Sequence, residues 1–229
     1  MQSLSLIIPA AGSGVRLGHD IPKPFIRIGD KTILEHTVSR FTALPNLKQV
    51  IVATSKNYIS TVRNMKVNIP EGIDLIVVEG GEERQFSIHN ALSEVSVDIE
   101  LIAVHDAVRP FIRTKLIAQC CEVAAEVGGA IIGVPAKDTI KKVDASGKII
   151  ATPDRSELWQ AQTPQVFRKS LLTEAYDSAM EAGFFGTDDA SLVERIGGVV
   201  KMVEGDRENL KITYPVDLKI AELILGEQL

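Results

Sequence analysis

A glycine-rich loop, PAAGSGVRLG from Pro9 to Gly18, follows the first apolar run of the chain. Small residues let the backbone approach a ligand closely, and successive N–H groups in such a loop can hold a phosphate. The loop is not a dinucleotide fingerprint, because Leu17 replaces the third glycine, nor a P-loop, because no Gly-Lys-Ser/Thr follows. Arg16 and Lys23 add two cations, and the prolines beside Lys23 stiffen its segment. This predicts a polyphosphate site, with a plain βα turn as the alternative.

A second cluster, HDAVRP, follows the apolar run Leu101–Val104. Asp106 at the carboxyl end of a strand could bind Mg²⁺, which prefers carboxylate and phosphate oxygens. Arg109 could bind a further phosphate through two hydrogen bonds. In the alternative interpretation, Asp106 caps a helix and Arg109 is a surface charge. His105 by itself is expected to be structural.

Two further segments carry candidate ligand-binding residues. The stretch GGEERQFS, from Gly80 to Ser87, opens a helix. Its glycines would permit close approach of a base or ribose, and Ser87 could hydrogen-bond to one, whereas Arg84 could simply pair with nearby acids. In DRSELWQAQTPQ, Arg155 is the charge of interest and Trp159 is expected in the core.

Two segments in the last third of the chain complete the set. The stretch TDDAS, from Thr187 to Ser191, is typical of a helix N-cap whose acids complement the helix dipole. The stretch VEGDRENLKIT, from Val203 to Thr213, carries Lys211, either a ligand-binding cation or an exposed strand lysine.

Strands and helices that would position these residues alternate along the chain. The apolar runs are continuous, as in strands buried on both faces of a mostly parallel sheet. The predicted strands are Leu4–Pro9, Gln49–Thr54, Ile73–Val78, Leu101–Val104, Ala130–Val134 and Val199–Val203. The predicted helices are Thr32–Ala43, Arg84–Val95, Thr114–Val127, Lys169–Ala182, Asp188–Ile196 and Val216–Leu225. This alternation predicts a three-layer α/β fold in one domain, residues 1–229.

One segment interrupts the alternation. Thr139–Thr152 reads TIKKVDASGKIIAT, two strand-like arms around a turn, and predicts a β-hairpin. We expect it to project as an arm over residues 136–158. A hairpin without its own core usually packs on something else, and a second subunit is the simplest candidate.

Composition excludes several classes of protein. The 229 residues are 45% hydrophobic and 24% charged, with a net charge of −5, which argues against nucleic-acid binding and a basic membrane-surface role. No apolar run is long enough to span a membrane, and the start resembles no signal peptide, so we expect a cytoplasmic protein. Cys120 and Cys121 are expected to be buried and unpaired, because adjacent helix positions point apart.

Taken in their order along the chain, these six segments resemble the 2-C-methyl-D-erythritol 4-phosphate cytidylyltransferase family of the non-mevalonate isoprenoid pathway. The likeness covers essentially the whole chain and departs from the family's frequent residues at Pro24 and Val108, neither of which removes a charge. It implies a Rossmann-like nucleotidyltransferase fold, a homodimer joined by the hairpin arm, and transfer of a cytidylyl group from CTP to methylerythritol phosphate with Mg²⁺ or another divalent cation.

The resemblance also implies a role for individual residues. Arg16 and Lys23 would stabilise the transition state, while Arg155 and Lys211 would position the sugar phosphate. The CTP site would comprise Ala10, Ala11, Gly12, Gly14, Gly81, Ser87 and Ala107. We add Asp106 to this site, and assign it the metal, from its position at the end of a strand and not from the resemblance. The sugar-phosphate pocket would comprise Asp106, Arg109, Thr139, Arg155, Thr163, Thr187 and Lys211. Thr139 and Arg155 bracket the arm, so one site is expected to draw on two chains.

Three other functions stay open from the sequence. A cytidylyltransferase for another polyol phosphate, such as ribitol 5-phosphate, would share the fold and mechanism. A nicotinamide-dependent oxidoreductase would use a similar first turn, although Leu17 and the nearby cations argue against it. A nucleotide-binding module without activity would bind CTP but not turn it over.

Overall fold

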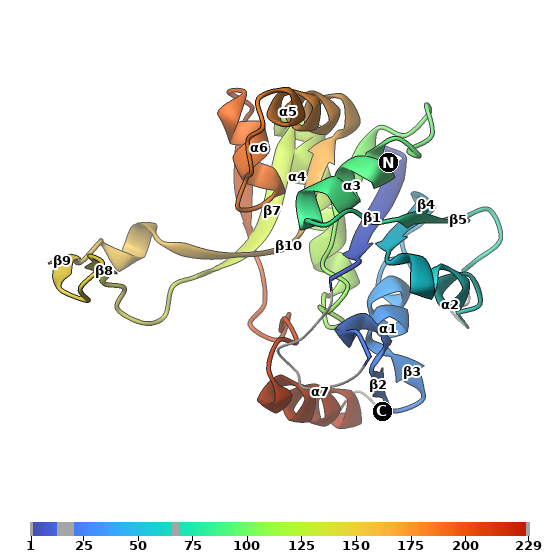
Figure 1. The fold of residues 1–229 in the computed structure, drawn as a ribbon, viewed down its shortest axis with the longest axis horizontal. Helices are drawn as coiled ribbons and strands as arrows, with labels where there is room; N and C mark the ends of the chain where they lie inside the picture. The colour runs from blue at the N-terminus through green and yellow to red at the C-terminus, as the bar shows by residue number, and fades with distance from the viewer. Residues whose placement is uncertain (1, 13–20, 66–68, 228–229) are drawn as a thin grey trace.

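Seven strands form one twisted sheet at the centre of the molecule (Figure 1). The computed structural model describes residues 2–12, 21–65 and 69–227, so the predicted site residues Gly14 and Arg16 lie outside the described residues. Across the sheet the order is β11 (Val200–Glu204), β7 (Gly129–Pro135), β10 (Trp159–Arg168), β6 (Leu101–Val104), β1 (Leu4–Ala10), β4 (Leu47–Thr54) and β5 (Asp74–Glu79). All six predicted strands are present, and they pair in parallel wherever they are neighbours.

The sequence does not predict the seventh strand, β10, which runs antiparallel between β6 and β7. Gln160, Gln162 and Pro164 break the apolar pattern of this segment, so it has no strand signature. The first three residues of β10 are exposed and lead out of the arm, and the following six are buried in the sheet. One strand therefore connects the arm directly to the core.

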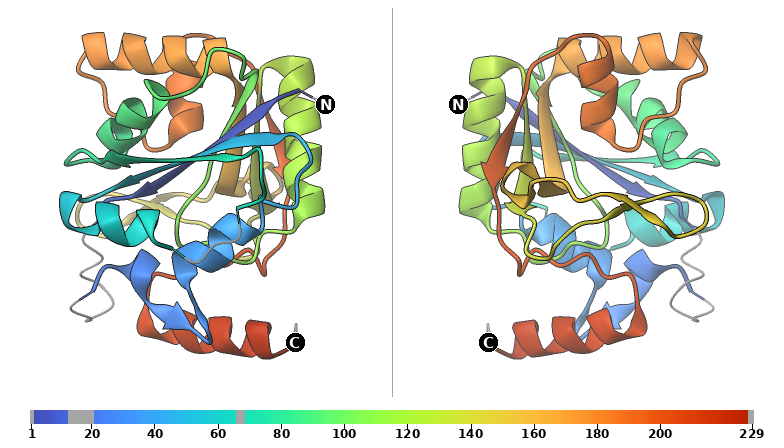
Figure 2. Two further views of the ribbon diagram at one scale, coloured as in Figure 1. Left: turned by 90° about the vertical axis from the view of Figure 1, so that its right-hand side faces the viewer. Right: turned by 90° about the vertical axis from the view of Figure 1, so that its left-hand side faces the viewer.

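Helices cover both faces of the sheet and confirm the three-layer α/β fold (Figure 2). On one face lie α1 (Ile33–Ser39), α2 (Ile59–Arg63) and α4 (Thr114–Val127). On the other lie α3 (Arg84–Leu92), α5 (Lys169–Glu181) and α6 (Asp189–Arg195). The short helix α2 is the one element of these layers that the helical periodicity does not predict.

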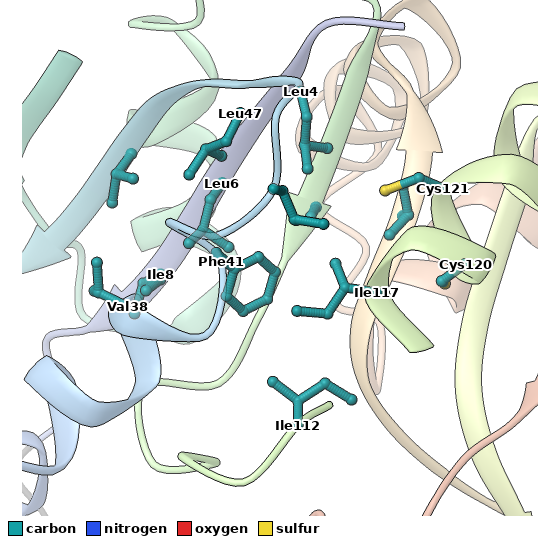
Figure 3. Close-up of a cluster of buried hydrophobic side chains, with 14 of the residues drawn as sticks. Leu4, Leu6, Ile8, Val38, Phe41, Leu47, Ile112, Ile117, Cys120 and Cys121 are labelled. Atoms are coloured by element: carbon teal, nitrogen blue, oxygen red, sulfur yellow. The ribbon is translucent and has the colours of Figure 1, made fainter. Parts of the chain in front are cut away.

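The core on the α1–α4 face is made of aliphatic and aromatic side chains (Figure 3). Leu4, Leu6 and Ile8 of β1 point to this face, whereas Ile7 between them packs on the opposite one, as strand geometry requires. Cys120 and Cys121 are buried here and free, as predicted, and burial raises the pKa of the Cys121 thiol to about 12. Neither thiol is therefore a nucleophile at neutral pH.

The C-terminal helix α7 (Pro215–Glu227) lies apart from the sheet (Figure 1). It packs Ala221 against a small cluster that includes Ile26 and Ile28, close to the short hairpin of β2 (Arg27–Ile28) and β3 (Lys31–Thr32). None of the described helices has the length and apolarity needed to cross a membrane.

The predicted hairpin is present and projects far from the body of the molecule (Figure 1). Its strands are β8 (Lys142–Val143) and β9 (Ile149–Ala151), joined by a turn in which the Asp144 carboxylate accepts hydrogen bonds from the Ser146 and Lys148 backbone. Val143, Ile149 and Ile150 are all half exposed on it. The arm therefore presents apolar side chains that no core of its own covers.

Candidate active site

A cavity of about 420 Å³ opens at the carboxyl ends of β1, β5 and β6, the edge where open α/β sheets bind ligands. Nine of the predicted site residues line it: Ala10, Ala11, Gly12, Lys23, Gly81, Ser87, Asp106, Ala107 and Lys211. They come from five separate segments of the chain. The segment after β6 and the segment that carries Lys211 face each other across this cavity, and Ile212 N–H donates to the Val108 carbonyl at 2.9 Å.

The glycines after β5 allow two loops to approach each other closely. A Cβ on Gly80 would lie 2.4 Å from the Cβ of Ala11 and 2.9 Å from the Ser87 hydroxyl. The Ser87 hydroxyl accepts a hydrogen bond from Gly81 N–H at 3.1 Å, and the loop is thereby fastened to α3. The two loops therefore pack closely, and a flat or anionic ligand on this side of the cavity could contact their backbone directly.

Lys23 is held in place by residues that lie far apart in the sequence. Its side chain is 8% exposed, and its Nζ donates to the Thr213 carbonyl at 2.9 Å. Pro24 follows it in a short 3₁₀ helix, and the next ring, Phe25, stacks on Tyr58 with centroids 4.3 Å apart. As the prolines predict, this segment is fixed and its cation lies in the cavity wall.

Asp106 lies among three cations. Its Oδ2 is 3.0 Å from Lys211 Nζ and 3.2 Å from Arg109 Nε, and its Oδ1 is 3.8 Å from Arg84 Nε. Burial alone would raise the pKa of this carboxyl, but the charges of Lys211, Arg84 and Arg109 lower that pKa well below its usual range. Asp106 is therefore ionised at neutral pH. It does not cap a helix, in contrast to the alternative interpretation, because no described helix begins next to it.

A buried chain of hydrogen bonds holds the backbone of Asp106. Its N–H donates to the Thr163 hydroxyl at 3.0 Å, which in turn lies 3.0 Å from His105 Nδ1. His105 Nε2 lies 3.0 Å from the Arg109 carbonyl, which can only accept, so Nε2 carries the proton and Nδ1 accepts from Thr163. His105 is thus structural, as expected, and Thr163 is committed to the same chain.

This geometry predicts acid lability. Burial lowers the pKa of His105 to about 4, whereas in the unfolded chain it is near 6.5, so between these values the unfolded state binds more protons. Stability from this group is complete above pH 6.5 and lost as the pH falls to 4, on the order of 3 kcal/mol. The free energy of unfolding, measured with denaturant between pH 7 and 4.5, should fall less steeply with decreasing pH in His105→Gln than in the wild type. A matched His89→Gln control should keep the steep slope; equal slopes in all three proteins would refute the assignment.

Arg109 and Asn209 fasten the segment that carries Lys211. Arg109 Nη1 donates to the Asn209 carbonyl at 2.7 Å, and Asn209 Nδ2 donates to Gln162 Oε1 and to the Thr163 carbonyl at 3.0 and 2.9 Å. Asn209 is fully buried and was not singled out in the sequence. A polar residue in an apparently solvated loop carries no signal of such a role.

Arg84 lies in the cavity wall and pairs with an acid, as the alternative reading of its segment proposes. Its terminal nitrogens donate to both oxygens of Asp189 at 3.1 and 2.7 Å. Asp188 is the N-cap of α6, accepting from Ser191 N–H, so the predicted helix start is confirmed. Arg84 also lines a second cavity of about 490 Å³.

Five predicted residues lie outside the main cavity: Arg109, Thr139, Arg155, Thr163 and Thr187. Thr187 lines the second cavity. Thr139 and Arg155 are exposed on the arm, where Arg155 donates to the Lys137 carbonyl at 2.8 Å. Trp159 is 38% exposed where β10 leaves the arm, so its predicted place in the core is wrong. Its segment becomes buried only further along β10.

The cavity carries charged groups of both signs, which suits an anionic ligand accompanied by a cation. Lys23, Arg84 and Lys211 contribute positive charge to the cavity, and Glu82, Glu83 and Asp106 contribute negative charge. Arg84 is already paired with Asp189, and Lys211 with Asp106. Within the described residues, no group of three or more His, Cys, Asp or Glu side chains could hold a metal by itself. A cation here would be bound by a protein carboxylate together with the phosphates of the ligand, as is common for Mg²⁺.

Comparison with known proteins identifies a family for the whole chain. The family model of 2-C-methyl-D-erythritol 4-phosphate cytidylyltransferase matches residues 4–227. A protein of that name from Caldanaerobacter subterraneus is 42% identical over 97% of this chain and 99% of its own. The one from Bacillus cereus is 43% identical over 98% of both chains.

Solved structures give the same answer. The crystal structure of 4-diphosphocytidyl-2C-methyl-D-erythritol synthase from Anaerococcus prevotii has a TM-score of 0.87 at 29% identity, covering 98% of this chain and 96% of its own. The cytidylyltransferase of Thermus thermophilus has a TM-score of 0.79 at 33% identity, covering 99% and 100%. The chain therefore belongs to the 2-C-methyl-D-erythritol 4-phosphate cytidylyltransferase family, enzymes that act as nucleotidyltransferases in the non-mevalonate isoprenoid pathway.

Proposed function

We propose that the cavity at the carboxyl ends of β1, β5 and β6 is where a cytidylyl group passes from CTP to 2-C-methyl-D-erythritol 4-phosphate. The observation that carries the proposal is the meeting of nine predicted residues in this one cavity. The backbone of Ala10–Gly12 would hold the CTP phosphates, and Gly81 and Ser87 would contact its cytidine side. Arg16, which lies outside the described residues, and Lys23 would face the reacting phosphate.

The reaction is an in-line displacement. A phosphate oxygen of the acceptor attacks the α-phosphorus of CTP, a new P–O bond forms, and the bond to the bridging oxygen of the β-phosphate breaks to release pyrophosphate. The nucleophile is already an anion, so no general base is needed. The main obstacle is repulsion between a triphosphate of charge near −4 and a phosphomonoester near −2. Fixed cations and positioning are what lower this barrier.

Mg²⁺ would be held here by ligands from both the protein and the substrate. Asp106 would hold it with one carboxylate oxygen, and substrate phosphates would supply others, since the described residues provide no larger carboxylate cage. When bound, the cation neutralises phosphate charge. Because Lys211 now pairs with Asp106 Oδ2 and is half exposed, it could turn toward an incoming phosphate without breaking the core.

We also propose that the arm joins two copies into a homodimer. The support is the row of half-exposed apolar residues on a projecting hairpin, Val143, Ile149 and Ile150. Replacing Lys142–Ile149 by a two-residue turn should give a monomer by light scattering, because the apolar contact is lost. Replacing the exposed Glu71 by serine is the control and should leave the dimer intact. A dimer that survives loss of the hairpin would exclude the arm as the interface.

The function is tested by pyrophosphate release with CTP and Mg²⁺, comparing methylerythritol phosphate with ribitol 5-phosphate as acceptor. We expect release with methylerythritol phosphate alone. Release only with ribitol 5-phosphate would keep the mechanism but change the pathway. CTP binding without release on either acceptor would favour a nucleotide-binding module. We place the reaction in the cytoplasm, since the two free thiols suit a reducing compartment.

A further inference from the structure

Arg84 is held by a carboxylate that lies outside the cavity. Asp189, at the first turn of α6, is fully buried and binds both terminal nitrogens of the guanidinium. The Tyr176 hydroxyl on α5 donates to Asp189 Oδ1 at 2.6 Å and so fixes the orientation of that carboxylate. A bidentate pair of this kind is both strong and geometrically specific.

The third nitrogen of Arg84 faces Asp106 without reaching it. Arg84 Nε lies 3.8 Å from Asp106 Oδ1, beyond hydrogen-bonding distance, while Arg109 and Lys211 both lie on Oδ2 at 3.2 and 3.0 Å. Within the described residues, Oδ1 therefore receives no hydrogen bond. It is the carboxylate oxygen that remains for a ligand.

We propose that Asp189 is a positioning residue that tethers Arg84 and so keeps Asp106 Oδ1 accessible to the cation that accompanies CTP. This inference rests on the proposed function, because it assumes that Asp106 shares such a cation. Without the charge on Asp189, the nearest carboxylate to Arg84 is Asp106, and attraction between opposite charges strengthens as the distance falls. Arg84 would then close onto Oδ1 and compete with the cation.

The test is calorimetric binding of CTP at a series of Mg²⁺ concentrations, with no acceptor and therefore no turnover. Asp189→Asn keeps the shape and the bond from Tyr176 but removes the charge. We expect it to raise the Mg²⁺ concentration for half-maximal CTP binding at least about tenfold, the usual cost of losing a group that supports a metal ligand. Adding Arg84→Gln to Asp189→Asn should reverse most of this increase, because the competing cation is gone.

Tyr176→Phe is the matched control. It removes a buried hydrogen bond from the same carboxylate but leaves the pair between Arg84 and Asp189 intact. We expect a lower melting temperature with little change in the Mg²⁺ requirement. If Asp189→Asn and Tyr176→Phe shift the requirement equally, or if Arg84→Gln fails to relieve Asp189→Asn, Asp189 has only a structural role and the tether is refuted.

Failure of the tether and failure of the proposed function are distinguishable through Asp106→Asn. If Asp106→Asn leaves Mg²⁺-dependent CTP binding unchanged, the cation assignment itself fails. If Asp106→Asn abolishes it and Asp189→Asn does not alter it, only the tether fails. Should Asp189→Asn not fold, the wild-type structure with CTP and Mg²⁺ decides: Arg84 still bound to Asp189 supports the tether, and Arg84 released onto Asp106 overturns it.

Discussion

Lys23→Met should lower kcat by about 10²–10³-fold, the usual cost of removing one preorganised charge that stabilises a transition state. Methionine keeps the length and packing of the buried stem, so the expected loss is one of charge. The fixed 3₁₀ segment and the bond to Thr213 show that Lys23 is oriented before any ligand binds. The measurement is pyrophosphate release at saturating CTP and acceptor.

Lys31→Met serves as the control for Lys23→Met. Lys31 is a nearby lysine that is exposed in β3 and does not line the cavity, so its loss should leave kcat unchanged. Circular dichroism and the melting temperature must show that both variants are folded. A folded Lys23→Met protein with a near-wild-type kcat would remove Lys23 from the catalytic machinery.

Arg155→Ala should also cost about 10²-fold or more in kcat, although Arg155 lies on the arm and not in its own chain's cavity. Our account predicts that it acts in the site of a second subunit. Mixing Arg155→Ala with Lys23→Met chains, after dissociation and reassociation, tests this directly. In a mixed dimer, one of the two sites would combine an intact Lys23 with an intact Arg155. Equal amounts of the two chains give about one half mixed dimers, so about a quarter of all sites would be active.

The two variants kept unmixed are the control for this experiment, and each should stay inactive. If Arg155 acts within its own chain, both sites of a mixed dimer carry one substitution and no activity returns. Absence of recovery, with mixed dimers demonstrated by mass spectrometry, would contradict a shared site.

The sequence predicts what is local and periodic. Continuous apolar runs mark β1, β4, β5, β6, β7 and β11, and the glycine-rich turn identifies the backbone that lines the cavity. Strand β10 escapes prediction because glutamines and Pro164 hide its pattern, and only pairing with β6 and β7 makes it a strand. Tertiary contacts decide such cases.

The second kind of miss concerns partners far apart in the chain. Arg84 and Asp189 are 105 residues apart, and Arg109 and Asn209 are 100 residues apart, so no spacing rule links them. Charges that look like ligand-binding groups in the sequence can be neutralised by such partners in the fold. Uncharged polar groups can be occupied in the same way: the Thr163 hydroxyl accepts from Asp106 N–H and lies 3.0 Å from His105 Nδ1.

A crystal structure with CTP and Mg²⁺ tests the central claim most directly. Our account predicts phosphates against the backbone of Ala10–Gly12, the cytidine beside Gly81 and Ser87, and Asp106 among the groups that hold the cation. CTP bound elsewhere, for example in the groove lined by Glu100 and Lys169 near the amino ends of β1 and β6, would contradict it.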